Sequence, residues 1–184
     1  AELAEKRRKD PKDDLTSALV HAHGNEEVLA EHEIAPFFIL LAVAGNDTTR
    51  TAISHGMHLL AQNPDQRAIW QNDLEGVTGT AVEEIVRVAS PVTFMRRTAT
   101  KDTTVGDHEF KEGDKVVLLY GAANRDPRVF ENPESFLVKR DPNPHVGFGG
   151  PGPHFCLGAH LARREVGVAF RQLLTRLPDI QITA

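Results

Sequence analysis

The longest helical pattern in the sequence covers residues 28–61, and it ends at Asn63 and Pro64 because proline cannot continue the hydrogen-bond ladder of a helix. A helix of that length extends about 50 Å, enough to cross a whole domain. It is therefore the element that most restricts how the rest of the chain can pack. Pro36 lies inside the pattern, so we expect a bend or a late helix start there.

The centre of this helix carries the sequence Ala-Gly-Asn-Asp-Thr-Thr at residues 44–49, where apolar residues would pack better. Gly45 costs about 1 kcal/mol relative to alanine in a helix interior, and Thr48 can bond back to a backbone carbonyl. One interpretation is a kink or a close helix crossing. The other is a groove beside a bound group, in which Asp47 and Thr48 handle protons.

Shorter elements follow the long helix. Residues 64–72 and 80–89 predict two short helices, and in the second Glu84 and Arg87 are three positions apart, where they can pair. Strand-forming residues in 92–104 and 115–120 predict a small sheet. Residues 124–136 are aperiodic and turn-rich, which is more often functional than accidental in a compact domain.

The last helix is predicted over residues 157–177. The apolar residues expected to face inward are Leu161, Val168, Leu173 and Leu174.

The only cysteine, Cys156, lies between a loop rich in glycine and proline and this last helix. The backbone N–H groups and the positive dipole end of the helix favour the thiolate form of a cysteine at its start. By itself this supports an activated cysteine, while a lone cysteine is in general more often a small buried apolar residue. A phosphate-binding loop at residues 147–152 is a further interpretation of the glycines. Against it, the segment is not followed by Lys-Ser/Thr and is not preceded by a convincing strand.

Composition excludes several classes of protein. The chain has 184 residues, long enough for one domain with a core, and a net charge of −5 that gives no footprint for nucleic acid. A single cysteine cannot form an internal disulfide, so we expect a reducing cytoplasm. The longest apolar run, residues 37–44, is far shorter than the roughly 20 residues of a membrane-spanning helix. Neither end has a start or stop signal, so we expect a fragment cut at both ends.

Four segments together resemble the cytochrome P-450 family of haem-thiolate monooxygenases. Residues 44–49 resemble the oxygen-binding groove of the family's central helix, and residues 84–87 resemble its Glu-x-x-Arg helix. The turn-rich segment that ends at Arg140 resembles the "meander", whose arginine joins that pair. The most specific match is residues 148–158, Phe-Gly-Gly-Pro-Gly-Pro-His-Phe-Cys-Leu-Gly, which resemble the cysteine-ligand loop.

The resemblance implies a mainly α fold, the C-terminal part of the cytochrome P-450 fold. Its parts are a long central helix, a Glu-x-x-Arg helix, a small β-sheet, the meander, the cysteine-ligand loop and the helix that follows. We expect residues 1–184 to form a single partial domain that binds haem. One departure is that the family places an aromatic residue seven positions before the cysteine, where this chain has Gly149, and Phe148 lies one position earlier.

The cofactor implied by the resemblance is haem b, with dioxygen as co-substrate and the Cys156 thiolate as iron ligand. The resemblance implies that Asp47 and Thr48 are the catalytic residues that deliver protons, with Asn46 and Thr49 as weaker candidates. It also implies that Arg97 and His154 bind the haem carboxylates, with Arg96 as an alternative to Arg97. The whole predicted cofactor-binding set is Ala44, Gly45, Arg97, Phe148, Gly149, His154, Cys156 and Gly158.

Two further groups of residues are assigned by resemblance. A substrate pocket is expected to be lined by Val92, Thr93, Phe94 and Met95. For each of these residues, ordinary packing in a strand core is an equally good interpretation. A structural brace without a chemical role is assigned to Glu84, Arg87 and Arg140. A buried carboxylate shared by two arginines is costly to disrupt, because removal of one partner leaves the other charges unpaired.

The implied function is a monooxygenase that inserts one oxygen atom into a hydrophobic substrate, with electrons from a ferredoxin or similar partner. The form of the cysteine loop resembles that of actinobacterial members that act on sterols and methyl-branched lipids. The partner would dock near Arg163, Arg164, His160 and Lys139, or these residues form a solvated helix face. The alternatives are a peroxygenase or isomerase on the same scaffold, and a non-catalytic fragment that does not retain haem.

Overall fold

The structure, a computed structural model, describes residues 2–21 and 30–182. Contacts between Cα atoms divide the chain into two compact units, residues 1–47 and residues 48–184. Each unit has a buried apolar cluster of its own. Among the described residues, none of the helices combines the length and the apolar character needed to span a membrane.

The first unit contains α1 (Glu2–Lys9), α2 (Leu15–Val20) and the beginning of α3 (Glu31–Gln62). The side chain of Asp14 accepts a hydrogen bond of 2.8 Å from the backbone N–H of Ser17. This is how an N-cap residue satisfies a free donor at a helix start. The buried cluster of this unit is Ala4, Val20 and Ile34.

The long central helix is confirmed as α3, which has 32 residues. The late start at Pro36 is wrong, since α3 begins at Glu31 and continues through the proline. The fixed φ of proline is compatible with a helix, and its place in the second turn removes one backbone hydrogen bond only. Residues 28 and 29 of the predicted range lie outside the described residues.

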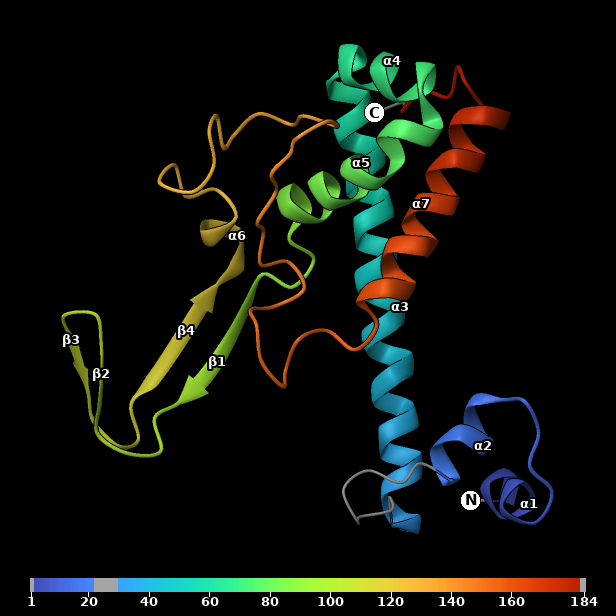
Figure 1. The fold of residues 1–184 in the computed structure, drawn as a ribbon, viewed down its shortest axis with the longest axis vertical. Coiled ribbons are helices and arrows are strands. Elements are labelled where there is room, and N and C mark those ends of the chain that lie inside the picture. The colour runs from blue at the N-terminus through green and yellow to red at the C-terminus, as the bar shows by residue number, and fades with distance from the viewer. Residues whose placement is uncertain (1, 22–29, 183–184) are drawn as a thin grey trace. The chain divides into compact units, whose positions relative to one another are not determined.

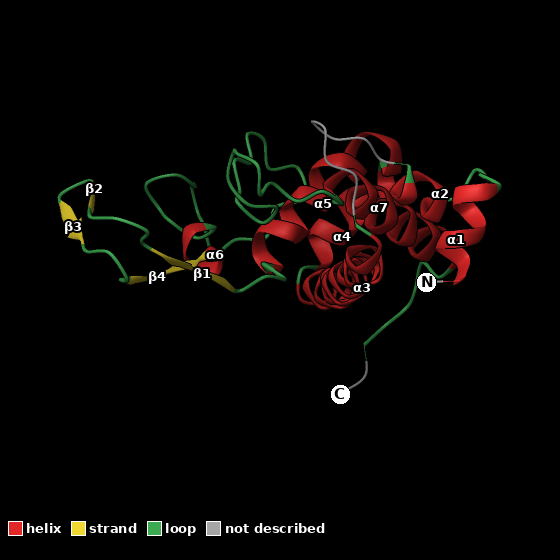
Figure 2. Ribbon diagram, turned by 90° about the horizontal axis from the view of Figure 1, so that it is seen from below, coloured by secondary structure: helices red, strands yellow, loops and turns green. Residues whose placement is uncertain are grey.

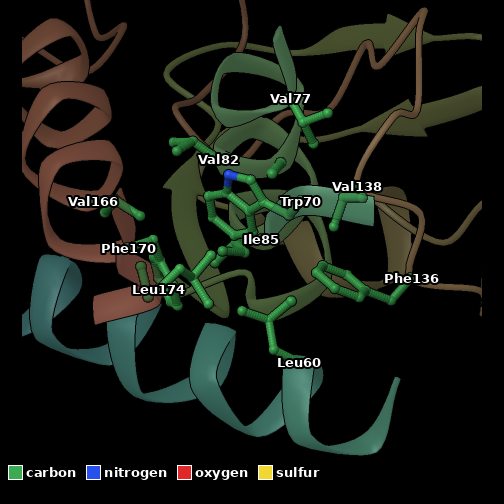
Figure 3. Close-up of a cluster of buried hydrophobic side chains, with 12 residues drawn as sticks. Leu60, Trp70, Val77, Val82, Ile85, Phe136, Val138, Val166, Phe170 and Leu174 are labelled. Atoms are coloured by element: carbon green, nitrogen blue, oxygen red, sulfur yellow. The ribbon is translucent and has the colours of Figure 1, made fainter. Parts of the chain in front are cut away.

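The second unit is built on α4 (Pro64–Asn72), α5 (Leu74–Ala89) and α7 (Ala159–Arg176), with α5 in contact with both other helices (Figure 1). Trp70 lies at the centre of the core, with Phe170 and Leu174 of α7 on one side and Phe136 and Val138 on the other (Figure 3). The rings of Trp70 and Phe170 are 5.1 Å apart. Complete burial of such large rings contributes strongly to the apolar stabilisation of this unit.

The predicted small sheet is present as two antiparallel pairs. β1 (Phe94–Thr98) pairs with β4 (Lys115–Leu119), and β2 (Thr103–Val105) pairs with β3 (His108–Phe110). The strands and α6 (Tyr120–Ala123) lie to one side of α4, α5 and α7 (Figure 2). Residues 124–158 then contain neither helix nor strand.

The predicted inward face of the last helix is partly wrong. Leu174 is buried, but Leu161 and Val168 are 60% and 52% exposed. The buried residues of α7 are instead Ala159, Val166, Gly167, Phe170 and Leu174. They follow the 3.6-residue period around Phe170, which packs on Trp70, and Leu161 and Val168 fall on another apolar face of the same helix.

Candidate functional site

A fully buried charged group centres on Glu84 of α5. Its carboxylate accepts two hydrogen bonds of 2.8 Å from Arg87. It also accepts one hydrogen bond from Nε of Arg140 that both oxygens share, each at 3.1 Å. Neither Glu84 nor Arg87 has solvent-exposed surface. Burial by itself raises the pKa of Glu84, but the hydrogen bonds from Arg87 and from the Leu137 N–H outweigh it and lower the pKa.

The two arginines also bind backbone carbonyls of the irregular segment 124–158. Arg87 donates to the carbonyls of Asn124, Pro133 and Ser135. Arg140 donates to the carbonyls of Glu131, Asn132 and Ser135. A segment without helix or strand must satisfy its buried carbonyls in some other way, so these guanidinium groups determine its path. The structure therefore brings the three predicted brace residues together.

The cysteine loop ends immediately before α7. Cys156 is exposed, and its backbone N–H donates to the carbonyl of Phe148 over 2.9 Å. Gly149 closes this turn with a φ of +89°, in the left-handed region that favours glycine. α7 begins at Ala159, two residues after the predicted start. Its first N–H donates to the Cys156 carbonyl over 3.2 Å, so the cysteine lies at the entrance of the helix.

The loop is pressed against α5. A Cβ atom added at Gly147 would lie 2.6 Å from Cγ1 of Val86 and 3.2 Å from its carbonyl oxygen. Only glycine fits this approach. On the same side of α5, Glu83 accepts a hydrogen bond of 2.9 Å from the ring of His145, the first residue of the loop.

Arg163 of α7 completes this contact. Its guanidinium donates to both carboxylate oxygens of Glu83, over 2.6 and 2.9 Å, and its Cζ lies 4.3 Å from the centre of the Phe148 ring. Burial by itself raises the pKa of Glu83, but the hydrogen bonds from His145 and Arg163 outweigh it and lower the pKa to about 2. Glu83 is therefore an anion bound to a histidine and an arginine.

The predicted haem-carboxylate and substrate residues lie mainly on β1. Phe94, Met95, Arg96 and Arg97 are all exposed. Because successive strand residues point to opposite faces, Arg96 shares a face with Phe94 and Arg97 shares the other with Met95. Only one of the two arginines can therefore face a given ligand. Val92, Thr93, His154 and Gly158 lie outside the strands and helices, with Val92 half-buried and the other three exposed.

The predicted catalytic and groove residues lie at the centre of α3. Ala44, Gly45, Asn46 and Asp47 are exposed, and Thr48 and Thr49 are half-buried. The Thr49 hydroxyl donates to Glu165 of α7 over 3.3 Å. A Cβ atom added at Gly45 would meet no atom of residues 2–21 or 30–182 within 4 Å. The space beside Gly45 is therefore open.

Sequence reasoning missed Glu83 and His145, and it assigned Arg163 to partner docking. The available signals were the adjacent acids Glu83 and Glu84 on one helix and the histidine that begins the loop. Neither signal is specific without the fold. In the structure the Arg163 guanidinium pairs with Glu83. The other predicted docking residues, Arg164, His160 and Lys139, are exposed.

The described part of the chain contains no cluster of three or more His, Cys, Asp or Glu residues that could bind an ion.

The sequence profile described as "Cytochrome P450" matches residues 1–178. A methyl-branched lipid omega-hydroxylase of Mycobacterium tuberculosis is 55% identical over 181 residues, which are 98% of this chain and 42% of that protein. A steroid C26-monooxygenase of Rhodococcus jostii is 48% identical over 179 residues, 97% of this chain and 37% of that protein. The chain thus spans about two fifths of the length of these curated relatives.

Solved structures agree with these similarities. The cytochrome P450 CYP268A2 of Mycobacterium marinum, in complex with pseudoionone, superposes with a TM-score of 0.91 at 52% identity. The superposition covers 98% of this chain and 44% of that one. The profile covers nearly every residue, and the curated relatives and the solved structure agree with it. The chain therefore belongs to the cytochrome P450 family.

Proposed function

We propose that this chain is the haem-binding part of a monooxygenase that inserts one atom of dioxygen into a hydrophobic substrate. The observation that carries the proposal is Cys156, an exposed thiol at the entrance of α7 with its N–H bound to the Phe148 carbonyl. A thiol held in this way is available to a metal, and family membership supplies the class of cofactor. The names of both relatives, a hydroxylase and a monooxygenase, favour this activity over a peroxygenase or an isomerase.

The residues around Cys156 fit a flat apolar cofactor with a metal at its centre. Phe155, Leu157 and Leu161 are 44%, 79% and 60% exposed, more apolar surface than a helix entrance leaves in water without a reason. A Cβ atom added at Gly158 would meet no atom of the described residues within 4 Å. The residues next to Cys156 in the sequence therefore offer both open space and exposed apolar side chains to haem b.

When bound, haem supplies the redox-active iron that activates dioxygen, and thiolate ligation favours O–O cleavage. Cys156 would hold the iron, and Arg97 and His154 would bind the two haem carboxylates, with Arg96 as the alternative on the other face of β1. Guanidinium suits a carboxylate because it donates two parallel hydrogen bonds. The remaining proposed contacts are Ala44, Gly45, Phe148, Gly149 and Gly158.

Asp47 and Thr48 are proposed to move protons. A carboxylate and a hydroxyl one residue apart can form a short relay with ordered water. Val92, Thr93, Phe94 and Met95 would contact a hydrophobic substrate, a sterol, a fatty acid or a methyl-branched lipid, as the names of the relatives suggest. A ferredoxin would deliver electrons by docking near Arg164, His160 and Lys139. The cytoplasmic location stays a prediction.

Replacement of the cysteine tests the proposal directly. Haem-loaded protein, reduced and treated with carbon monoxide, is expected to show the strongly red-shifted Soret band of thiolate ligation. Cys156→Ser is expected to lose that band completely, because the chain has no other cysteine. A wild-type protein without the band would favour the non-catalytic alternative. Far-ultraviolet circular dichroism of both proteins checks that the substitution has left the helices folded.

Replacement of Thr48 tests the proton relay. Thr48→Ala is expected to retain haem and consume reductant, but to release hydrogen peroxide instead of oxidised product, because the hydroxyl of the relay is missing. Thr51→Ala, three residues further along α3, is the matched control and is expected to keep product and reductant coupled. Full coupling in Thr48→Ala would remove Thr48 from the relay.

A further inference from the structure

Glu83 and its partners form a second charged group beside the brace, and the proposed chemistry does not use it. Glu83, His145, Phe148 and Arg163, here called the loop clamp, come from α5, the cysteine loop and α7. We propose that Glu83 is a positioning residue that fixes the cysteine loop through its bonds to His145 and Arg163 and sets the charge beside the Cys156 sulfur. The inference rests on the proposed function in one respect, that Cys156 is a metal ligand.

The histidine of the clamp is held in one tautomer. The Gly147 N–H donates to Nδ1 of His145 over 3.0 Å, so Nδ1 carries a lone pair and Nε2 carries the hydrogen. Nε2 then donates to Glu83 over 2.9 Å. The His145 side chain is 3% exposed. A buried neutral imidazole that spans a backbone N–H and a carboxylate is a rigid link between the start of the loop and α5.

The other end of the clamp reaches the cysteine through Phe148. Cζ of Arg163 lies 4.3 Å from the centre of the Phe148 ring, and the centre of the His145 ring lies 5.8 Å from the same point. The carbonyl of Phe148 accepts the Cys156 N–H. A fixed ring therefore fixes the acceptor of the hydrogen bond that orients the cysteine backbone.

The clamp also controls a charge close to the sulfur. The hydrogen bond from Glu83 is the largest cause that raises the pKa of Arg163, and the Cys156 charge is a further cause. Geometry places the same guanidinium beside the cysteine loop, because its Cζ lies 4.3 Å from the centre of the Phe148 ring and the Phe148 carbonyl accepts the Cys156 N–H. Glu83 neutralises this cation, and removal of the Glu83 charge leaves a net positive charge beside the metal ligand.

The two helices provide a matched control. Glu75 of α5 pairs with Arg171 of α7, so it joins the same helices as Glu83 and Arg163. Its side chain is 80% exposed, and neither residue belongs to the loop clamp. Glu75→Gln therefore removes an ion pair between α5 and α7 and leaves the clamp intact.

Reduction potential distinguishes positioning and charge from simple stability. In haem-loaded protein, Glu83→Gln is expected to shift the potential to more positive values, because the uncovered Arg163 cation favours the reduced, more negative site. Arg163→Gln is expected to shift it to more negative values. Glu75→Gln should leave it unchanged. Shifts of the same sign in both clamp variants, or no shift in either, would overturn the proposal.

Hydrogen exchange tests the loop without use of the metal. In cofactor-free protein, the amides of residues 145–158 are expected to exchange about tenfold faster in Glu83→Gln than in wild type, while the amides around Trp70 and Ile85 keep their rates. Equal acceleration in both regions would mean general destabilisation and would overturn the proposal. If Glu83→Gln does not fold, Arg163→Lys, which keeps the charge and loses the two-pronged contact, replaces it with the same expected contrast.

The two measurements separate this inference from the proposed function. A wild-type protein without a thiolate-type spectrum would contradict the function, while the exchange contrast would still decide whether Glu83 holds the loop.

Discussion

Glu83 and Glu84 are neighbours in the sequence and bind entirely different partners. Successive residues of a helix point about 100° apart, so Glu84 meets Arg87 and Arg140 on one side while Glu83 meets His145 and Arg163 on another. One carboxylate holds the irregular segment and the other holds the cysteine loop. A substitution at either position therefore tests a different part of the site.

The low pKa of Glu83 gives its contribution a characteristic pH dependence. Its folded pKa of about 2 is below the ordinary value of 4.5, so its stabilisation is complete above pH 4.5 and is lost as the pH falls toward 2. Glu83→Gln is expected to lower the free energy of unfolding at pH 7 by about 2 kcal/mol, discounted for partial exposure. The difference from wild type should shrink steadily below pH 4.5.

Denaturant unfolding of both proteins at pH 7, 4.5 and 3 measures this difference. Glu75→Gln, whose side chain is 80% exposed, serves as the control and should follow wild type at each pH. A deficit in Glu83→Gln that is the same at pH 7 and pH 3 would mean that the carboxylate charge is not its source.

At the scale of elements, Gly56 and Gly79 both lie in the interior of a helix, but only Gly56 has close neighbours from other elements. A Cβ atom at Gly56 of α3 would lie 2.5 Å from Cζ of Phe170 and 2.8 Å from Cδ1 of Ile85. A Cβ atom at Gly79 of α5 would meet no atom of the described chain within 4 Å. Gly56 therefore permits a close packing of α3 on α5 and α7, and Gly79 is a glycine that packing does not require.

Alanine at these two positions should shift stability in opposite directions. Gly56→Ala is expected to destabilise by about 1–3 kcal/mol, because the ring of Phe170 must move. Gly79→Ala is expected to stabilise by up to about 1 kcal/mol through helix propensity alone. Thermal unfolding measures both, at about 2–4 °C of midpoint per kcal/mol for a chain of this size. Equal signs for the two variants would contradict the packing described here.

The helices could largely be predicted from the sequence, because proline, glycine and apolar period are local signals. The ends of α3 and α7 lie within three residues of their predicted positions, for the residues that the structure describes. The buried face of α7 could not be predicted, because the helix has two apolar faces and contact with Trp70 selects one. The loop clamp was missed for a related reason, since Glu83, His145 and Arg163 are far apart in sequence and each alone is ordinary.

At the scale of the molecule, residues 124–158 have no helix or strand, and yet they carry the cysteine and two residues of the loop clamp. The conformation of this segment therefore depends on hydrogen bonds between side chains and its backbone. Arg87 alone binds three of their carbonyls while it pairs with Glu84. Arg87 therefore connects the packed helices to the segment that presents Cys156.

Loss of Arg87 should disorder this segment and release the cofactor. Arg87→Ala leaves the buried Glu84 charge with one arginine partner, which costs about 3–5 kcal/mol. It also removes the donor to the carbonyls of Asn124 and Pro133, while the Ser135 carbonyl keeps its hydrogen bond from Arg140. We expect a thermal midpoint lower by about 10 °C and protein purified without haem. Arg128→Ala is the control in the same segment, because the Arg128 side chain is 87% exposed, and it should stay close to wild type in haem content. Normal haem content and stability in Arg87→Ala would show that Glu84 and Arg140 hold the segment without it, and the brace would then be a contact of two residues instead of three.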